Sequence, residues 1–196
     1  MSQNDHAFIY RLRALSFQYL LKVVNGEAEK LKHARDEFVS QWGALGTQWG
    51  INRTMAQIHA LLMVSPQPLS TDDIMADLQI SRGNAHGNLR DLVGWGLIRS
   101  VIRKGERKEF FEAEKDVWKM FCTIIRERKR REIRPAIGVL KDCIERAETL
   151  KDAEAVTFTK QTKALLGFVE MADSFLSKMT RSEQSKVIPW LLKWMS

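Results

Sequence analysis

The sequence predicts a mostly α-helical protein with one short β hairpin near its middle. Apolar residues recur at helical spacing through most of the 196 residues. Only the residues on either side of the Lys104-Gly105-Glu106 turn are typical of paired strands. The 11 glycines and four prolines argue against a collagen-like or low-complexity chain. This length fits one domain, or a small domain with an assembly module, and is long enough to bury a core.

Composition excludes several classes of protein. No stretch approaches the roughly 18 apolar residues that a membrane span needs, and the first residues lack the pattern of a secretory signal. Two cysteines, Cys122 and Cys143, cannot build a disulfide framework. We therefore expect a soluble, cytoplasmic protein without membrane contact. Its cysteines are expected to be buried and reduced rather than to act as a thiol sensor.

The first 47 residues are expected to form packing and dimerisation helices. Apolar residues crowd more than one face of residues 6–24, and Asn25-Gly26 is a turn signal. A second helix is predicted after that turn, with its apolar stripe on Leu31, Ala34, Phe38 and Trp42. Glycines between residues 43 and 50 then interrupt the pattern, so we place the first domain boundary there.

Residues 48–114 are predicted to hold three short helices followed by the hairpin. Asn52, Ser70 and Ser81 can each cap a helix at its amino end. The third helix would bury Ala85, Leu89, Leu92 and Val93 on one face. Strands are expected over residues 97–103 and 108–113, with Gly105 in the turn at positive φ.

Residues 115–196 are predicted to be helical and to serve dimerisation. Pro135 is expected to kink or restart a helix that begins near Asp116. From Phe158 to Met179, residues at alternating spacings of four and three form a heptad stripe with one polar position, Thr162. The spacing alone fits contact with a second chain and burial within one chain equally well. A short final helix is predicted over residues 183–195.

The net charge of +7 is concentrated in one region. Residues 81–134 hold 15 Lys/Arg against eight Asp/Glu, whereas the remaining residues hold 16 of each. A localised basic region is typical of proteins that bind a polyanion, most often nucleic acid. The alternative is a basic surface that serves solubility.

The helix that Ser81 begins carries the clearest functional signal. Gly83, Asn84, Gly87 and Arg90 lie opposite its predicted buried face, where each glycine costs about 1 kcal/mol relative to alanine. A partner that approaches the backbone closely would explain these glycines, and a solvated helix of poor propensity is the alternative. Asparagine reads adenine and arginine reads guanine in the major groove, and amides at the helix start can bind a phosphate.

A short helix, a tight turn, a Ser-capped helix and a basic hairpin together form a winged helix-turn-helix. In that geometry the capped helix enters the major groove and the hairpin reaches the DNA backbone or the minor groove. The DNA-binding residues expected on the helix are Ser81, Arg82, Gly83, Asn84, His86, Gly87, Asn88 and Arg90. Those expected on the hairpin are Arg103, Lys104, Arg107 and Lys108.

Residues 50–134 resemble the GbsR-type branch of the MarR-like winged-helix transcriptional regulators. The segments that carry the resemblance are Leu69-Ser-Thr-Asp-Asp-Ile-Met, Ser81-Arg-Gly-Asn-Ala-His-Gly-Asn-Leu-Arg-Asp-Leu, Gly94-Trp-Gly-Leu-Ile and Gly105-Glu-Arg-Lys-Glu-Phe-Phe-Glu-Ala. The resemblance implies a homodimer that binds operator DNA, here expected to repress, and that often responds to a small molecule. It also implies dimerisation through terminal helices, which favours a contact between chains for Phe158, Leu165, Val169, Ala172, Leu176 and Met179.

The sequence allows more than one interpretation of three features. The run from Arg126 to Arg134 fits a solvated helix face, a DNA-backbone contact or an interface salt-bridge network. Trp42, Trp49 and Trp118 could line a pocket for an effector. The winged helix could instead be the docking platform of a non-catalytic protein-interaction adaptor, or bind RNA, although its short helices suit B-form DNA better. No enzyme motif, cofactor or metal site is expected.

Overall fold

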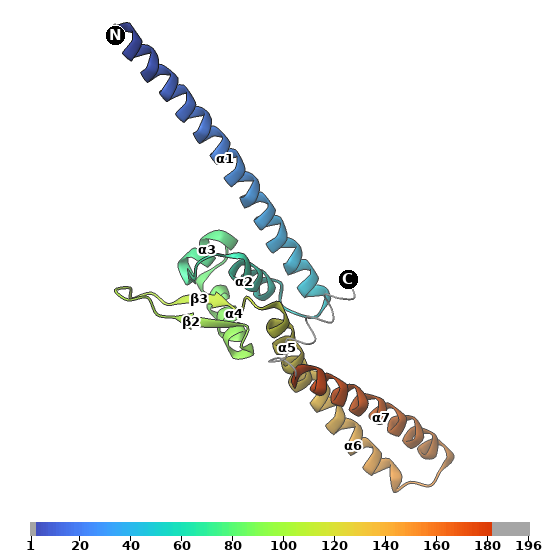
Figure 1. Ribbon diagram of the computed structural model, residues 1–196. Coiled ribbons are helices and arrows are strands. Elements are labelled where there is room, and N and C mark those ends of the chain that lie inside the picture. Colours follow the sequence, from blue (N-terminus) through green and yellow to red (C-terminus); the bar gives the residue numbers. More distant parts are fainter. Residues whose placement is uncertain (1–2, 182–196) are drawn as a thin grey trace. The chain divides into compact units, whose positions relative to one another are not determined.

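The computed structural model describes the backbone of residues 3–181 and the side chains of residues 26–181 (Figure 1). Its elements, in chain order, are α1 (Gln3–Gln48), α2 (Arg53–Val64), β1 (Leu69–Ser70), α3 (Thr71–Leu78), α4 (Arg82–Trp95), β2 (Ile98–Val101), β3 (Phe110–Ala113), α5 (Val117–Arg128), the π-helix η1 (Lys129–Ile133), α6 (Arg134–Glu148) and α7 (Ala153–Arg181). These elements confirm the predicted mostly helical, winged helix-turn-helix fold. The helix predicted over 183–195 lies outside the described residues. Among the described helices, none combines the length and apolar character of a membrane span.

The chain divides into two compact units, residues 1–88 and residues 89–196. The division falls within α4, so the first unit contains the start of that helix and the second contains its end. The division into parts at 1–47, 48–114 and 115–196 remains a prediction.

The predicted turn at Asn25-Gly26 is wrong, because α1 continues through it without a break. A Cβ built on Gly26 would meet no described residue within 4 Å, and its φ is not positive, so neither packing in the described part of the chain nor backbone conformation requires this glycine. A single glycine weakens a helix by about 1 kcal/mol, which does not suffice to end one.

Two glycines that the sequence analysis took for an interruption lie inside α1, where they allow close packing on α2. A Cβ on Gly43 would come within 2.5 Å of the Gln57 side chain, and one on Gly46 within 2.6 Å of the Ala56 Cβ. The helix ends later, at Gln48, and Gly50 follows with a φ of +72°. The core of the first unit includes the fully buried side chains of Ile58, Leu61, Leu62 and Ile74.

The three predicted helix caps are confirmed. The Asn52 side chain accepts a hydrogen bond from the Met55 amide at 3.1 Å. Ser70 and Asp73 form a reciprocal capping box at the start of α3. The Ser81 hydroxyl accepts a hydrogen bond from the Asn84 amide at 3.3 Å, so α4 begins where the sequence predicts.

The hairpin has the predicted turn but shorter strands. β2 and β3 pair antiparallel, with Ile98 opposite Ala113 and Val101 opposite Phe110. Gly105 has the expected positive φ, +88°. Pairing ends at Val101 and Phe110, and the side chain of Ile102 is 91% exposed, so the residues beyond the ladder form a long protruding tip.

The last two described helices of the second unit form a helical hairpin. α6 and α7 pack side by side and antiparallel (Figure 1). Pro135 lies in the first turn of α6, where its missing amide is tolerated. The π turn η1 immediately precedes α6, so of the two predicted alternatives, a kink or a restart at Pro135, the elements fit a restart.

Candidate nucleic-acid interface

The first half of α4 presents an open face to solvent. Gly83, Asn84 and His86 are exposed, and a Cβ on Gly83 or Gly87 would meet nothing within 4 Å. The opposite face carries Ala85, Leu89 and Leu92, each at most 1% exposed. Because no neighbour among the described residues requires these glycines, the structure supports the interpretation that an outside partner approaches the backbone here.

Two residues of α4 do not lie where the sequence analysis expected. Val93, predicted to be buried, is 42% exposed, and Asn88, predicted to flank the open face, is 9% exposed. At about 100° per residue, Asn88 and Val93 lie at opposite edges of the buried arc. The arc is rotated toward Asn88, so the polar side chain is covered and the apolar one is not.

Asn88 instead holds Asn84 in place. Its Nδ2 donates to the Asn84 carbonyl oxygen at 2.8 Å and to the Asn84 Oδ1 at 2.7 Å. With its Oδ1 accepting a hydrogen bond, the exposed Asn84 amide keeps its Nδ2 group for a partner. Arg82, exposed at the first position of α4, forms an ion pair with Asp72 of α3 at 2.7 Å.

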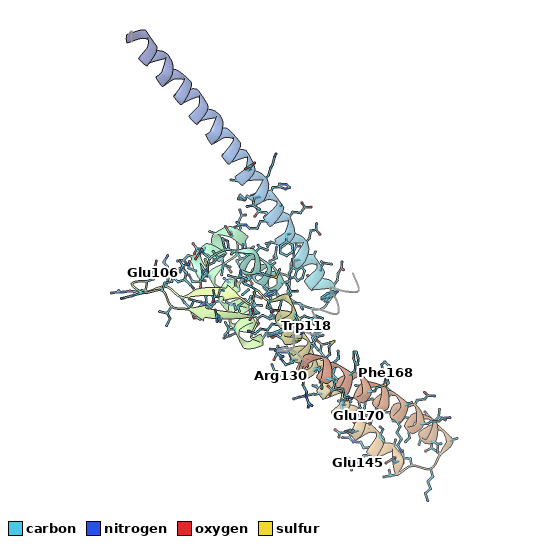
Figure 2. The ribbon with its side chains drawn as sticks, in the orientation of Figure 1. Glu106, Trp118, Arg130, Glu145, Phe168 and Glu170 are labelled. Carbon is cyan, nitrogen blue, oxygen red and sulfur yellow. The ribbon has the colours of Figure 1, made fainter. Side chains whose placement is uncertain are left out.

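The tip of the β2–β3 hairpin is basic. Lys104, Arg107 and Lys108 are exposed on it, and Glu106 marks its end in Figure 2. The guanidinium of Arg103 lies 4.4 Å from the centroid of the Phe110 ring. This cation–π contact anchors one cation at the base of the tip.

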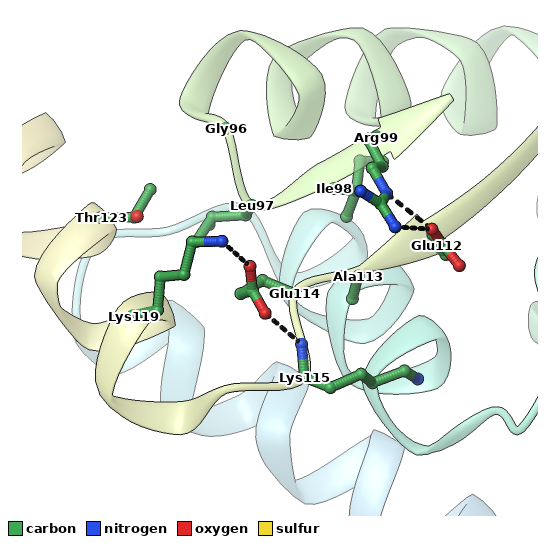
Figure 3. Close-up of a pocket in the computed structure, with 10 residues that line it drawn as sticks. All are labelled: Gly96, Leu97, Ile98, Arg99, Glu112, Ala113, Glu114, Lys115, Lys119 and Thr123. Carbon is green, nitrogen blue, oxygen red and sulfur yellow. Dashed lines mark hydrogen bonds and ion pairs between the residues drawn. The ribbon is translucent and has the colours of Figure 1, made fainter. Parts of the chain in front are cut away.

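A polar cavity of about 470 Å³ lies between the end of α4, the two strands and the start of α5 (Figure 3). The Lys119 ammonium lies 2.6 Å from the Glu114 carboxylate, and Arg99 lies 2.5 Å from Glu112. The Lys119 hydrogen bond lowers the pKa of Glu114 below its ordinary value. Because these charges satisfy one another, the arrangement supports the base of the hairpin and gives no clear ligand chemistry.

α7 carries a stripe of exposed apolar side chains, which only partly matches the predicted seam. Phe158 and Leu165 of the seam are 48% and 51% exposed, whereas the other four seam residues are half-buried. The most exposed members of the stripe, at 62–66%, lie outside the predicted seam: Phe168, Met171 and Phe175. The predicted seam follows the border between the face packed on α6 and the exposed face.

The three tryptophans predicted to line a pocket lie in different units. Trp42 is half-buried and 5.6 Å from the Phe38 ring, centroid to centroid, while Trp49 is 64% exposed. Trp118 stacks on Phe121 at 5.5 Å, and its buried indole nitrogen has no hydrogen-bond partner among the described residues. None of the three lines the cavity of Figure 3. A tryptophan-lined effector pocket remains a prediction.

Neither Cys122 nor Cys143 forms a disulfide. Cys122 is fully buried, as predicted, whereas Cys143 is half-buried on α6. Within residues 26–181, no three His, Cys, Asp or Glu side chains form a group that could hold a metal ion.

Comparison with known proteins identifies similar transcriptional regulators. The chain is 21% identical over 118 residues to the HTH-type transcriptional repressor GbsR of Bacillus subtilis (strain 168), covering 60% of this chain and 65% of the relative. It is 19% identical over 94 residues to the putative HTH-type transcriptional regulator YvaV of the same strain, covering 48% and 53%. Each match therefore spans less than two thirds of the relative. No model of a known protein family matches the chain.

A solved structure described as a transcriptional regulator shares the fold. It has a TM-score of 0.61 at 17% identity and covers 77% of this chain and 99% of its own. These matches confirm the resemblance to GbsR-type regulators that the segments around α3, α4 and the hairpin predicted.

Proposed function

We propose that this protein is a sequence-specific, DNA-binding transcriptional regulator that acts as a homodimer and represses. The observation that carries the proposal is the open face of α4, where Asn84 is exposed and no described residue lies within 4 Å of a Cβ built on either of two glycines. α4 enters the major groove, with Arg82, Asn84, His86 and Gly87 toward the bases. Ser81, Gly83 and Arg90 bind phosphates near the helix, and Asn88 positions Asn84.

The hairpin supplies backbone contacts. Arg103, Lys104, Arg107 and Lys108 add positive charge at a protruding tip, and such contacts release counterions from DNA. The phosphate contacts thus provide affinity and the α4 contacts provide sequence preference.

The exposed stripe of α7 supports the homodimer. A phenylalanine buries about 150–250 Å², so five large side chains at exposures of 48–66% offer on the order of 500 Å². That is a large part of the roughly 800 Å² that each partner contributes to a standard interface. The interface therefore includes Phe168, Met171 and Phe175 beside the residues of the predicted seam.

We also propose that a small molecule controls the affinity of the protein for DNA. The protein is located in the cytoplasm, where the DNA is. The sign of regulation follows the relative that is named a repressor. The protein acts by binding rather than by catalysis. The tryptophans Trp42, Trp49 and Trp118 are the first places to look for a copurifying ligand.

The test is footprinting on the DNA that flanks the protein's own gene. The native chain should protect a specific site, and the variant Arg82→Glu/Arg90→Glu should lose it. A control with the same charge change at the end of α6 and in the turn that follows, Arg146→Glu/Lys151→Glu, should retain it. If the native chain binds no duplex at moderate salt but captures an acidic protein through the same arginines, the adaptor function replaces this proposal.

A further inference from the structure

The π turn η1 lies at the centre of the basic run Arg126–Arg134. The amide of Arg134 donates to the Lys129 carbonyl, five residues back, where an α-helix would bond four back. Such single turns occur frequently at functional sites. The turn sends two of its cations to defined partners in the second unit.

The first cation, Lys129, is directed at α7. Its side chain is 8% exposed, and its Nζ lies 3.0 Å from the Asp173 Oδ1. The same Nζ donates to the Asp173 carbonyl oxygen at 2.9 Å and to the Ser177 hydroxyl. A buried ammonium must be paired, so these contacts fix η1 against one turn of α7.

The second cation, Arg131, is directed at α4. Its guanidinium carbon lies 4.8 Å from the centroid of the Trp95 ring, and Trp95 is the last residue of α4. The Arg131 Nε also lies 3.2 Å from the Glu127 carboxylate, which orients the side chain. Gly96, with a φ of +73°, ends the helix directly after Trp95.

We propose that Arg131 is a positioning residue for α4, and that the Lys129–Asp173 pair sets where Arg131 stands. η1 then links the conformation of α7 to the end of the DNA-reading helix. The expected effect of this link on DNA binding rests on the proposed function. The contacts of Lys129 and Arg131 themselves are present without DNA. The basic run is thereby neither a plain solvated face nor a simple series of phosphate contacts.

The first experiment replaces Arg131 and reads both DNA binding and the indole of Trp95. Arg131→Leu should weaken operator binding about two- to five-fold, the value of an exposed cation–π contact, and leave the salt slope unchanged. Arg131→Lys should restore part of the affinity. The Trp95 indole NMR signal, assigned with Trp95→Phe, should shift in Arg131→Leu.

The matched control is Arg130→Leu. Arg130 shares the Glu127 carboxylate, at 2.7 Å, and projects from η1 with a side chain that is 55% exposed (Figure 2). The Arg130→Leu variant should leave the Trp95 indole signal unshifted. A salt slope that falls by about one in Arg131→Leu would instead assign Arg131 to a phosphate, and equal Trp95 signals in both variants would also overturn the proposal.

The second experiment tests the link to α7 with a double-mutant cycle. Lys129→Met/Asp173→Leu removes the buried Lys129 charge together with its half-buried partner Asp173, which is less damaging than leaving either charge without the other. On this background Arg131→Leu should change the Trp95 signal much less than in the native chain. If the double variant does not fold, Ser177→Ala is the milder replacement. It should also make the Arg131→Leu change in the Trp95 signal smaller than in the native chain.

Additive effects of the two changes would show that η1 carries no coupling. Because the Trp95 signal needs no DNA, this outcome can be told apart from failure of the proposed function. A native chain that binds no duplex would refute the function, while a shift of the Trp95 signal would still establish the positioning contact.

Discussion

A buried amide that holds an exposed one is the main feature of the site at the scale of single residues. Asn88 donates twice to Asn84, which restricts the rotamers of Asn84 before any partner arrives. A prepositioned side chain loses less conformational entropy on binding. In the proposed complex with DNA, we therefore expect Asn84 to read a base and Asn88 to position it.

Asn84→Ala should relax sequence preference. We expect a loss of roughly 1–3 kcal/mol at one base pair and little change on random duplex. Titrations of operator and random DNA at one salt concentration measure the difference. Equal losses on both duplexes would contradict base reading by Asn84.

Lys104→Ala should act differently, because a phosphate contact has no sequence preference. Binding should weaken on every duplex, and the slope of log affinity against log salt should fall by about one. Lys151→Ala, a change of an exposed lysine on the α6–α7 turn, serves as the control. An unchanged slope would remove Lys104 from the interface.

His59 should make stability depend on pH. The side chain is 4% exposed, its Nε2 has no hydrogen-bond partner in the described part of the chain, and burial lowers its pKa from 6.5 to about 4. The unfolded chain therefore takes up the proton first as pH falls. The contribution of neutral His59 is complete above about pH 6.5 and decreases toward pH 4, by about 3 kcal/mol in all.

Unfolding by urea at pH 7.5 and pH 5 tests this dependence. His59→Leu should lose much of the difference in stability between the two pH values, whereas His86→Ala, at an exposed position of α4, should retain it. If His59→Leu behaves like the native chain, His59 does not control the acid sensitivity.

At the scale of elements, the glycines of α4 lower the stability of the helix and leave its backbone accessible to a partner. Gly87 lies inside the helix, and no described residue lies within 4 Å of a Cβ built on it, so Gly87→Ala should stabilise the protein by about 1 kcal/mol. The same methyl group should weaken DNA binding, because it occupies the space the duplex needs. Thermal unfolding and DNA titration measure the two effects.

Gly138→Ala is the control for this prediction. Gly138 lies in α6, exposed and also without neighbours for a Cβ, so its replacement should raise stability alone. If Gly87→Ala binds operator as tightly as the native chain, the close approach to α4 is wrong.

At the scale of the whole molecule, the exposed apolar stripe of α7 predicts self-association. Phe168→Lys removes a side chain whose burial contributes about 1.5–3 kcal/mol, so the dimer should dissociate at least about ten-fold more readily. Sedimentation measures the change. Ser174→Lys, about 120° round the helix, is the control, and a dimer unaffected by Phe168→Lys would place the interface elsewhere.

Local signals in the sequence determined most of the fold and part of the site. The caps at Asn52, Ser70 and Ser81 and the positive φ of Gly105 depend on neighbours within a few residues. The open glycines of α4 were recognisable because they lie opposite an apolar stripe. These features need no knowledge of distant contacts.

Tertiary structure decided which residues of each helix are buried and which are exposed, because this depends on the exact direction in which a helix face points. A rotation of the buried arc covered Asn88 and exposed Val93, and a similar offset on α7 moved the exposed stripe to Phe168, Met171 and Phe175. The Asn25-Gly26 signal was overridden within α1, and Gly43 and Gly46 proved to be packing positions against α2. Periodicity gives the direction of a helix face only to within about one residue, or 100°, and only packing against a neighbour removes that uncertainty.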